Sequence, residues 1–153
     1  MQPLHGKQAL TYDDINLIPQ YSDIESRSQI DLTTQLTTNY KIKVPLIASP
    51  MDTVCDSEMA IAMMELGGVG CIHRFMSIED QAAEVSKVHS FRFKEKSIPI
   101  MAAVGANGDY FERTEALVNA GVNVILIDVA HGHHAFVREA LIKIKDKIGR
   151  AHV

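Results

Sequence analysis

The sequence predicts an α/β fold in which a short buried strand is followed by a helix four times over. Each predicted strand is an apolar run without polar alternation, which is typical of strands covered on both faces of a parallel sheet. Each run ends in turn-forming or capping residues, after which apolar side chains recur at helical spacing. The chain has 153 residues, 46% of them hydrophobic, which is enough for the packed core of one domain or of part of one.

The first residues, up to about position 40, show no long helical period. Three turn-forming strings interrupt this segment: Tyr12-Asp13-Asp14, Ile18-Pro19-Gln20 and Ser26-Arg27-Ser28. Leu32 and Leu36 alternate loosely with polar residues in the stretch 31–38, so we expect this stretch to pair with 41–44 as a short hairpin. An extended segment broken by turns is therefore expected ahead of the strand–helix units.

The first unit passes within a few residues from a buried strand to a polar loop. Residues 46–48 form the predicted strand, and Pro50 helps to stop it because proline has no N–H for a sheet ladder. The string Asp52-Thr53-Val54-Cys55-Asp56-Ser57 offers several caps for a helix over 57–66, which Gly67-Gly68 ends. The loop of residues 49–53 is therefore expected at the carboxyl end of a strand, where α/β folds bind ligands.

Three further units follow. The second has a strand at 69–72 and a helix that opens with the capping-box-like Ser77-Ile78-Glu79-Asp80. The third has a strand at 98–104 and a helix at 110–119, and the fourth has a strand at 122–127 and a helix at 135–147. One face of the last helix is expected to carry Phe136, Val137, Ala140, Leu141 and Ile144. Four such units can form half of an eight-unit barrel or a small doubly wound sheet, and periodicity alone does not choose between them.

Charge and composition exclude several classes of protein. Lys and Arg number 15 against 19 Asp and Glu, a net charge of −4 without a long block of either sign, so nothing indicates nucleic-acid or membrane binding. No apolar run approaches the roughly 20 residues that cross a bilayer, and the N-terminus is unlike a signal peptide, so we expect a cytoplasmic protein. Two cysteines, Cys55 and Cys71, do not imply a disulfide framework.

Three motifs stand in order along the chain: Leu10-Thr11-Tyr12-Asp13-Asp14, Ser49-Pro50-Met51-Asp52-Thr53-Val54 and Gly67-Gly68-Val69-Gly70-Cys71-Ile72-His73-Arg74. Together they resemble the family of inosine monophosphate dehydrogenases and guanosine monophosphate reductases, and the likeness covers residues 8 to 147. The resemblance implies a (β/α)8 TIM barrel that binds its nucleotide at the carboxyl ends of the strands. On that basis residues 1–147 are the N-terminal half of the barrel, about four βα units preceded by the extended segment.

The last six residues, Ile148-Gly149-Arg150-Ala151-His152-Val153, are small and polar for the end of an amphipathic helix. The likeness to the family stops at Lys147. The nucleotides ATC GGA AGA GCA CAC GTC of a widely used sequencing adapter encode this hexapeptide. We therefore expect residues 148–153 to be a sequencing-adapter artefact and the natural protein to continue past Lys147.

Ser49 and Met51 match family positions that contact the purine nucleotide, the serine towards the phosphate and the methionine against the base. A hydroxyl group and a soft apolar side chain suit these two tasks. Without the resemblance, the residues themselves favour a loop serine bonded to its own backbone and a core methionine.

Three residues match family positions on the dinucleotide side. Asp128 follows an apolar strand, and the resemblance implies that its carboxylate bonds the nicotinamide ribose; the alternative is a helix-capping aspartate. Arg74 follows the strand at 69–72, where relatives carry His, Lys or Arg near the dinucleotide. Ser26 matches a weaker contact on the adenosine side, or is only a turn residue.

The catalytic group of the family is a cysteine thiolate in a glycine-rich loop after the sixth strand, which attacks C2 of the purine. That loop is absent here, so we expect no catalytic residue and no turnover from this chain alone, with Cys55 and Cys71 as structural residues. The string His131-Gly132-His133-His134 lacks the spacing of a metal site, and no metal is expected. Gly105-Ala106-Asn107-Gly108-Asp109 has neither the lysine nor the glycine spacing of a phosphate loop and is predicted to be a strand-to-helix turn.

Most dehydrogenases of the family insert two cystathionine-synthase-type modules between the second helix and the third strand, where this chain has only the short link 88–98. The missing insertion and Ile72-His73-Arg74-Phe75 favour a reductase. Ala102-Ala103-Val104-Gly105 and Asp52-Thr53-Val54 favour a dehydrogenase, some of which also lack the insertion. We expect an IMP dehydrogenase, with a GMP reductase as the alternative and a non-catalytic nucleotide-binding half-barrel as a second class.

The resemblance also implies the ligands of the full-length protein. They are a purine nucleoside monophosphate as substrate and NAD as cofactor, or NADP for a reductase, with a monovalent cation such as potassium. A homotetramer is the expected assembly.

Overall fold

The computed structural model describes residues 9–91 and 98–148, in two units that are considered separately, Met1–Asp31 and Leu32–Val153. The described part of the first unit has no strands. It contains two short 3-10 helices, η1 (Tyr12–Asp14) and η2 (Arg27–Gln29). The predicted extended segment is therefore confirmed, with turns at two of the three predicted strings; the chain at Ile18-Pro19-Gln20 has no turn. Of the predicted artefact at 148–153, all but Ile148 lies outside the described residues, as does most of the link at 88–98.

The second unit begins with a hairpin in which β1 (Thr34–Thr37) pairs antiparallel with β2 (Tyr40–Ile42). Four parallel strands then form one sheet in the order β3-β4-β5-β6. Their bounds are Ile47–Ala48, Val69–Ile72, Met101–Val104 and Val124–Ile127. Each is followed by a helix, and these are α1 (Ser57–Glu65), α2 (Ile78–Phe91), α3 (Tyr110–Asn119) and α4 (Ala135–Ile148).

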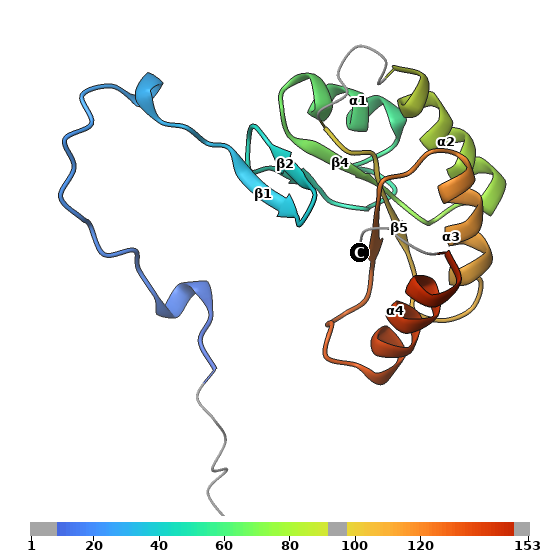
Figure 1. Cartoon of the computed structure of the whole chain (residues 1–153). Helices are drawn as coiled ribbons and strands as arrows, with labels where there is room; N and C mark the ends of the chain where they lie inside the picture. Colours follow the sequence, from blue (N-terminus) through green and yellow to red (C-terminus); the bar gives the residue numbers. More distant parts are fainter. Residues whose placement is uncertain (1–8, 92–97, 149–153) are drawn as a thin grey trace, which may run out of the picture. The chain divides into compact units, whose positions relative to one another are not determined.

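Consecutive helices pack on one another, α1 on α2, α2 on α3 and α3 on α4, so the four helices form one layer over the sheet (Figure 1). A doubly wound sheet reverses its strand order and has helices on both faces, whereas a (β/α)8 barrel keeps the order of the chain and has its helices outside. The observed arrangement is that of consecutive units of the barrel. It confirms the predicted half-barrel and removes the alternative that periodicity left open.

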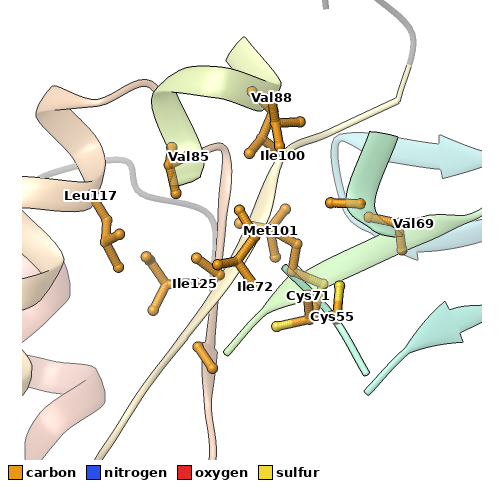
Figure 2. Close-up of a cluster of buried hydrophobic side chains, with 14 of the residues drawn as sticks. Cys55, Val69, Cys71, Ile72, Val85, Val88, Ile100, Met101, Leu117 and Ile125 are labelled. Atoms are coloured by element: carbon orange, nitrogen blue, oxygen red, sulfur yellow. The ribbon is translucent and has the colours of Figure 1, made fainter. Parts of the chain in front are cut away.

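The core lies between the sheet and the helix layer. Figure 2 shows part of it, with Val85 and Val88 of α2 and Leu117 of α3 in one cluster with Ile72 and Ile125 of the sheet. Burial of such aliphatic side chains stabilises the fold by about 1.5–3 kcal/mol each. Among the described residues, the helices are too short or too polar for any of them to cross a membrane.

The ends of the elements follow from local chemistry. Asp56 accepts a hydrogen bond from the backbone N–H of Met59 and caps α1. Gly67 has a φ of 87° and ends α1, while the N–H of Gly68 bonds the carbonyl of Met63, as in a Schellman motif. Ser77 accepts from the N–H of Asp80 at the start of α2, so the predicted cap is confirmed.

β5 and β6 start later than the sequence predicts. The N–H of Ile100 bonds the side-chain Oδ1 of Asn123 rather than a neighbouring strand. The N–H groups of Asn123 and Val124 both donate to the carbonyl of Ile100. This side-chain bridge replaces the first rungs of the ladder, so regular pairing begins only at Met101 and Val124.

Candidate functional site

A pocket of about 270 Å³ opens at the carboxyl ends of β4, β5 and β6. Its lining comes from the three loops that follow these strands and from the start of α4. The lining residues are Arg74, Gly105, Ala106, Asn107, Asp128, Val129, Ala130, His131, His134, Phe136 and Val137. The pocket is therefore at the edge of the sheet where α/β barrels bind their ligands.

Arg74 and Asp128, both predicted to be cofactor-binding residues, meet at this pocket. Arg74 Nε lies 3.1 Å from Asp128 Oδ2, and the two side chains are 35% and 29% exposed. Arg74 Nη2 is 3.5 Å from the carbonyl oxygen of Asp128. The ion pair joins loops that are 54 residues apart in the chain and leaves Oδ1 of Asp128 without a donor among the described residues.

Phe75 and Gly105 border the guanidinium of Arg74. Its Cζ lies 5.2 Å from the centre of the Phe75 ring, within the range of a cation–π interaction. Gly105 leaves room for it, because a Cβ added there would lie 3.7 Å from Arg74 Nη1, in van der Waals contact. The space open to the guanidinium is therefore limited by the loop after β5 as well as by its own loop.

Asp128 extends the sheet rather than starting a helix. Its backbone N–H donates to the carbonyl of Val104, one residue beyond the regular pairing of β5 and β6. α4 begins only at Ala135. The helix-capping alternative for Asp128 is therefore wrong, and the carboxylate is placed at the mouth by the end of β6.

The loop after β6 supplies aromatic walls to the pocket. The Phe136 ring lies 4.9 Å from that of His134, and the Phe136 N–H donates to His134 Nδ1. Phe136 is 50% exposed, whereas Val137, Ala140 and Ile144 are buried. The predicted apolar face of α4 is thus correct for these three residues, while Leu141 is half-buried. It is wrong for Phe136, which lies outside the buried stripe and lines the pocket.

Ser49 and Met51 lie after β3, the strand next to β4, and are not part of the pocket lining. Both are exposed, Met51 to 52%, so Met51 is not a core methionine. The carbonyl of Ser49 accepts from the N–H of Met51, but the Ser49 hydroxyl has no partner among residues 9–91 and 98–148. A hydroxyl and an apolar side chain thus stand open at the carboxyl edge of the sheet.

Ser26 belongs to the first unit. Its Oγ accepts from the N–H of Ser28 and lies 2.9 Å from Ser28 Oγ, so the residue caps η2. This is the turn role that the sequence offers as its alternative, and a contact of Ser26 with a cofactor stays a prediction.

Both cysteines are buried and free. Burial, followed by the nearby charge of Asp56, raises the pKa of Cys55 to about 12. Burial raises the pKa of Cys71 as well, with Cys55 and Asp128 acting in the same direction. The thiolate is the nucleophilic form of cysteine, so neither thiol is an active nucleophile at neutral pH.

The histidine-rich turn at residues 131–134 does not bring together a set of metal ligands. Within the described part of the chain, no three His, Cys, Asp or Glu side chains are grouped so that they could hold a metal ion. His134 Nδ1 is already engaged by the N–H of Phe136. His131 and His134 instead contribute flat, polar walls to the pocket.

Two parts of the pocket were not indicated by the sequence pattern. Asn107 and its neighbours lie in the loop between β5 and α3, which is the predicted strand-to-helix turn, and their only sequence signal is their place after a strand. Phe136 carried the signal of a core residue. A pocket with a cation, a carboxylate, an amide and aromatic rings can bind a ribose and a planar heterocycle together.

Comparison with known proteins agrees with this fold. A family model described as IMP dehydrogenase / GMP reductase domain matches residues 9–153. The chain therefore belongs to the IMP dehydrogenase / GMP reductase family, a family of oxidoreductases.

The relatives include both IMP dehydrogenases and GMP reductases. The inosine-5'-monophosphate dehydrogenase of Borreliella burgdorferi is 36% identical in an alignment of 186 positions, which covers 92% of this chain and 46% of that protein. The corresponding enzyme of Nitrosopumilus maritimus is 56% identical over 82 residues, 54% of this chain and 17% of that protein. The GMP reductase of Leishmania donovani is 49% identical over 81 residues, 53% of this chain and 16% of that protein. This chain thus spans less than half the length of these relatives.

Proposed function

We propose that this chain is part of an IMP dehydrogenase, which converts IMP, NAD and water to XMP and NADH. The observation that carries the proposal is the ion pair of Arg74 and Asp128 beside a pocket at the carboxyl ends of β4 and β6. The pocket fits one nucleoside-sized portion of a dinucleotide, because its volume of about 270 Å³ is near the lower end of ligand pockets, which span about 300–1,000 Å³.

Each residue of the pocket has a role in this proposal. Asp128 Oδ1 accepts a hydrogen bond from a ribose hydroxyl, while Arg74 holds Oδ2 and thereby orients the carboxylate. The aromatic rings of His134 and Phe136 exclude water beside the ribose. When bound, NAD accepts the hydride that leaves C2 of the purine. Ser26 is proposed to contact the adenosine side.

The purine nucleotide is proposed to bind at the neighbouring loop after β3. The Ser49 hydroxyl, which has no partner in the described part of the chain, donates to the phosphate, and the exposed side chain of Met51 packs against the base. β3 is adjacent to β4, so the two substrates meet at one edge of the sheet. The nucleophilic cysteine is proposed to lie in a loop outside this chain, because both cysteines here are buried thiols.

A GMP reductase is the second candidate. It is favoured by the Leishmania donovani relative and by the short link between α2 and β5. The dehydrogenase is favoured because the relatives from Borreliella burgdorferi and Cryptosporidium parvum, which match 92% of the chain, are both IMP dehydrogenases. A match over about half of the chain does not separate the two activities, since the Nitrosopumilus maritimus dehydrogenase covers 54% and this reductase 53%.

The test is to purify the protein encoded by the complete coding sequence and to follow the reduced nicotinamide spectroscopically. NADH formed only when IMP is present is the expected result. Consumption of NADPH with GMP and release of ammonia would instead identify a reductase. Binding of the nucleotide without either turnover would refute an enzyme and leave a nucleotide-binding protein. The 153-residue chain alone is expected to show no turnover.

A further inference from the structure

α2 and α3 share a buried cluster of polar side chains that the proposed chemistry does not use. Gln81 of α2 is fully buried, and Arg113 of α3 is 7% exposed. Asp109, the residue before α3, completes the cluster and is half exposed. Polar groups of this kind are costly to bury unless every donor and acceptor has a partner. Their hydrogen-bond partners therefore show which parts of the chain the cluster holds in place.

The guanidinium of Arg113 makes five hydrogen bonds, the number of its N–H groups. Nε and Nη2 donate to Asp109 Oδ2 at 3.1 and 2.6 Å. Nη2 also donates to the carbonyl of Met76 at 3.1 Å. Nη1 donates to Gln81 Oε1 at 2.9 Å and to the carbonyl of Ser77 at 3.4 Å. One side chain of α3 thus holds the end of the loop after β4 and the end of the loop after β5.

Gln81 connects this cluster to the sheet. Its Nε2 donates to the carbonyls of Ile72 and Ala103, at 3.4 and 2.9 Å, while its Oε1 accepts from Arg113. Ile72 is the last residue of β4, and Ala103 is the last but one of β5. The cluster therefore fixes the points at which both loops leave the sheet as well as the points at which they enter their helices.

The two loops held in this way are those that form one side of the pocket. The loop after β4 carries Arg74, and the loop after β5 carries Gly105 and Asn107. The gap between Gly105 and the guanidinium of Arg74 is about one methyl group wide, because a Cβ added to Gly105 would lie 3.7 Å from Arg74 Nη1. A shift of the loop after β4, or a closer approach of the loop after β5, would therefore move that guanidinium relative to Asp128. We propose that Arg113, supported by Gln81, is a positioning residue that sets the geometry of the Arg74–Asp128 pair and through it the affinity for the dinucleotide.

This inference rests on the proposed function, since it gives the pocket a dinucleotide. Arginine is required rather than a cation in general, because lysine has three donors on a single atom and cannot reach two carbonyls, an amide and a carboxylate in different directions. Misplacement of a binding group by about 1 Å can reduce activity about 100-fold.

The first experiment is hydrogen–deuterium exchange on the full-length protein with Arg113→Met. Residues 73–77 and 105–109 are expected to exchange faster, while α1 and the hairpin β1–β2 keep their rates. The matched control is Lys145→Met, which removes an exposed cation from α4 and is expected to change none of these rates. Equal exchange in the two loops for Arg113→Met and the control would overturn the positioning role, whatever the protein catalyses.

The second experiment is a double-mutant cycle in the same full-length protein. Arg113→Met is expected to raise the KM for NAD about tenfold, with the KM for IMP unchanged within about twofold, and Arg113→Lys is expected to behave in the same way. In an Arg74→Met background the same change should have little further effect on the KM for NAD. Additive effects, equal losses for both substrates, or full rescue by lysine would show that Arg113 has only a structural role.

Asp109→Ala keeps the experiment decisive if Arg113→Met does not fold. Asp109 is half exposed, and its side chain makes no capping bond with α3, so the variant is expected to fold. It leaves Arg113 Nε without an acceptor and should raise the KM for NAD about threefold. No change would overturn the inference. If Arg74→Met alone leaves the KM for NAD unchanged, the proposed cofactor site is wrong, and the exchange experiment still tests the positioning of the loops.

Discussion

Replacing Asp128 by alanine in the full-length protein is expected to impair use of the dinucleotide and not use of the purine nucleotide. The variant removes a carboxylate that is proposed to accept a hydrogen bond from a ribose hydroxyl. A hydrogen bond to a charged group contributes about 1.5–3 kcal/mol. Since 1.4 kcal/mol corresponds to a factor of ten, the KM for NAD should rise about tenfold to about a hundredfold.

The effect of the same change on stability should be smaller. Asp128 forms an ion pair with Arg74, but the two side chains are 29% and 35% exposed. Ion pairs of this exposure contribute about 0.2–1 kcal/mol, because water screens them. The loss of binding is therefore expected to exceed the loss of stability, and the variant should remain folded.

Ser49→Ala provides the reverse comparison. It removes a hydroxyl that is proposed to donate to the phosphate of the nucleotide, so the KM for IMP should rise while that for NAD stays nearly constant. Steady-state kinetics with each substrate varied in turn measures this crossed pattern, and Asp146→Ala, an exposed carboxylate on α4, serves as the control. If both variants lost the same substrate, or if Asp128→Ala mainly lowered the Tm, the proposed division of the site would be refuted.

Three further predictions concern the fold. Cys55 and Cys71 should resist alkylation by iodoacetamide at pH 8 in the native protein and react on unfolding, since burial raises the pKa of both thiols; rapid native labelling would contradict this. Burial alone would raise the pKa of Glu84, but hydrogen bonds from Lys87 and Ser57 lower it below its usual 4.5, so Glu84→Gln should cost about 1 kcal/mol at pH 7. This difference in unfolding free energy between the two proteins should be present above pH 4.5 and disappear as the pH falls below it. Calorimetry across this pH range would measure it, and a difference that did not change with pH would disprove the linkage. Gly70→Ala should destabilise the sheet by about 1–3 kcal/mol in denaturant melts, because a Cβ there would lie 2.6 Å from the backbone of α1, and an unchanged midpoint would show that α1 can move away.

The elements that the sequence predicted best are those with local signals at both ends. β4 and α3 have the predicted bounds, since glycine, a turn or an acidic residue marks where each begins or ends. β5 and β6 were predicted too long, because the Asn123 side chain that replaces their first backbone pairing acts across 23 residues. Periodicity reports burial and does not report which partner satisfies a given N–H group.

In the candidate site, too, local features could be predicted and contacts between distant residues could not. The positions of Arg74 and Asp128 at the ends of strands could be inferred from the chain, whereas their pairing over 54 residues could not. Gln81 did have a signal, because it stands in line with Val85 and Val88 at helical spacing and so replaces an apolar residue in a buried stripe. A glutamine at such a position indicates a buried hydrogen-bond network, but the sequence does not indicate that Arg113, 32 residues away, completes it.

The sequential order of the strands has a kinetic consequence. Each strand of the four-stranded sheet pairs with strands next to it in the chain, so each new strand–helix unit can add to the edge of the sheet as it is synthesised. Asp128 follows Arg74 by 54 residues, and at about 5–20 residues per second it leaves the ribosome roughly 3 to 11 seconds later. A nascent chain paused late in that interval, after residue 104 has emerged, already has β3 to β5 to pack against α1 and α2, but it lacks the carboxylate that completes the pocket. The ligand site can therefore be completed only after Asp128 has been synthesised.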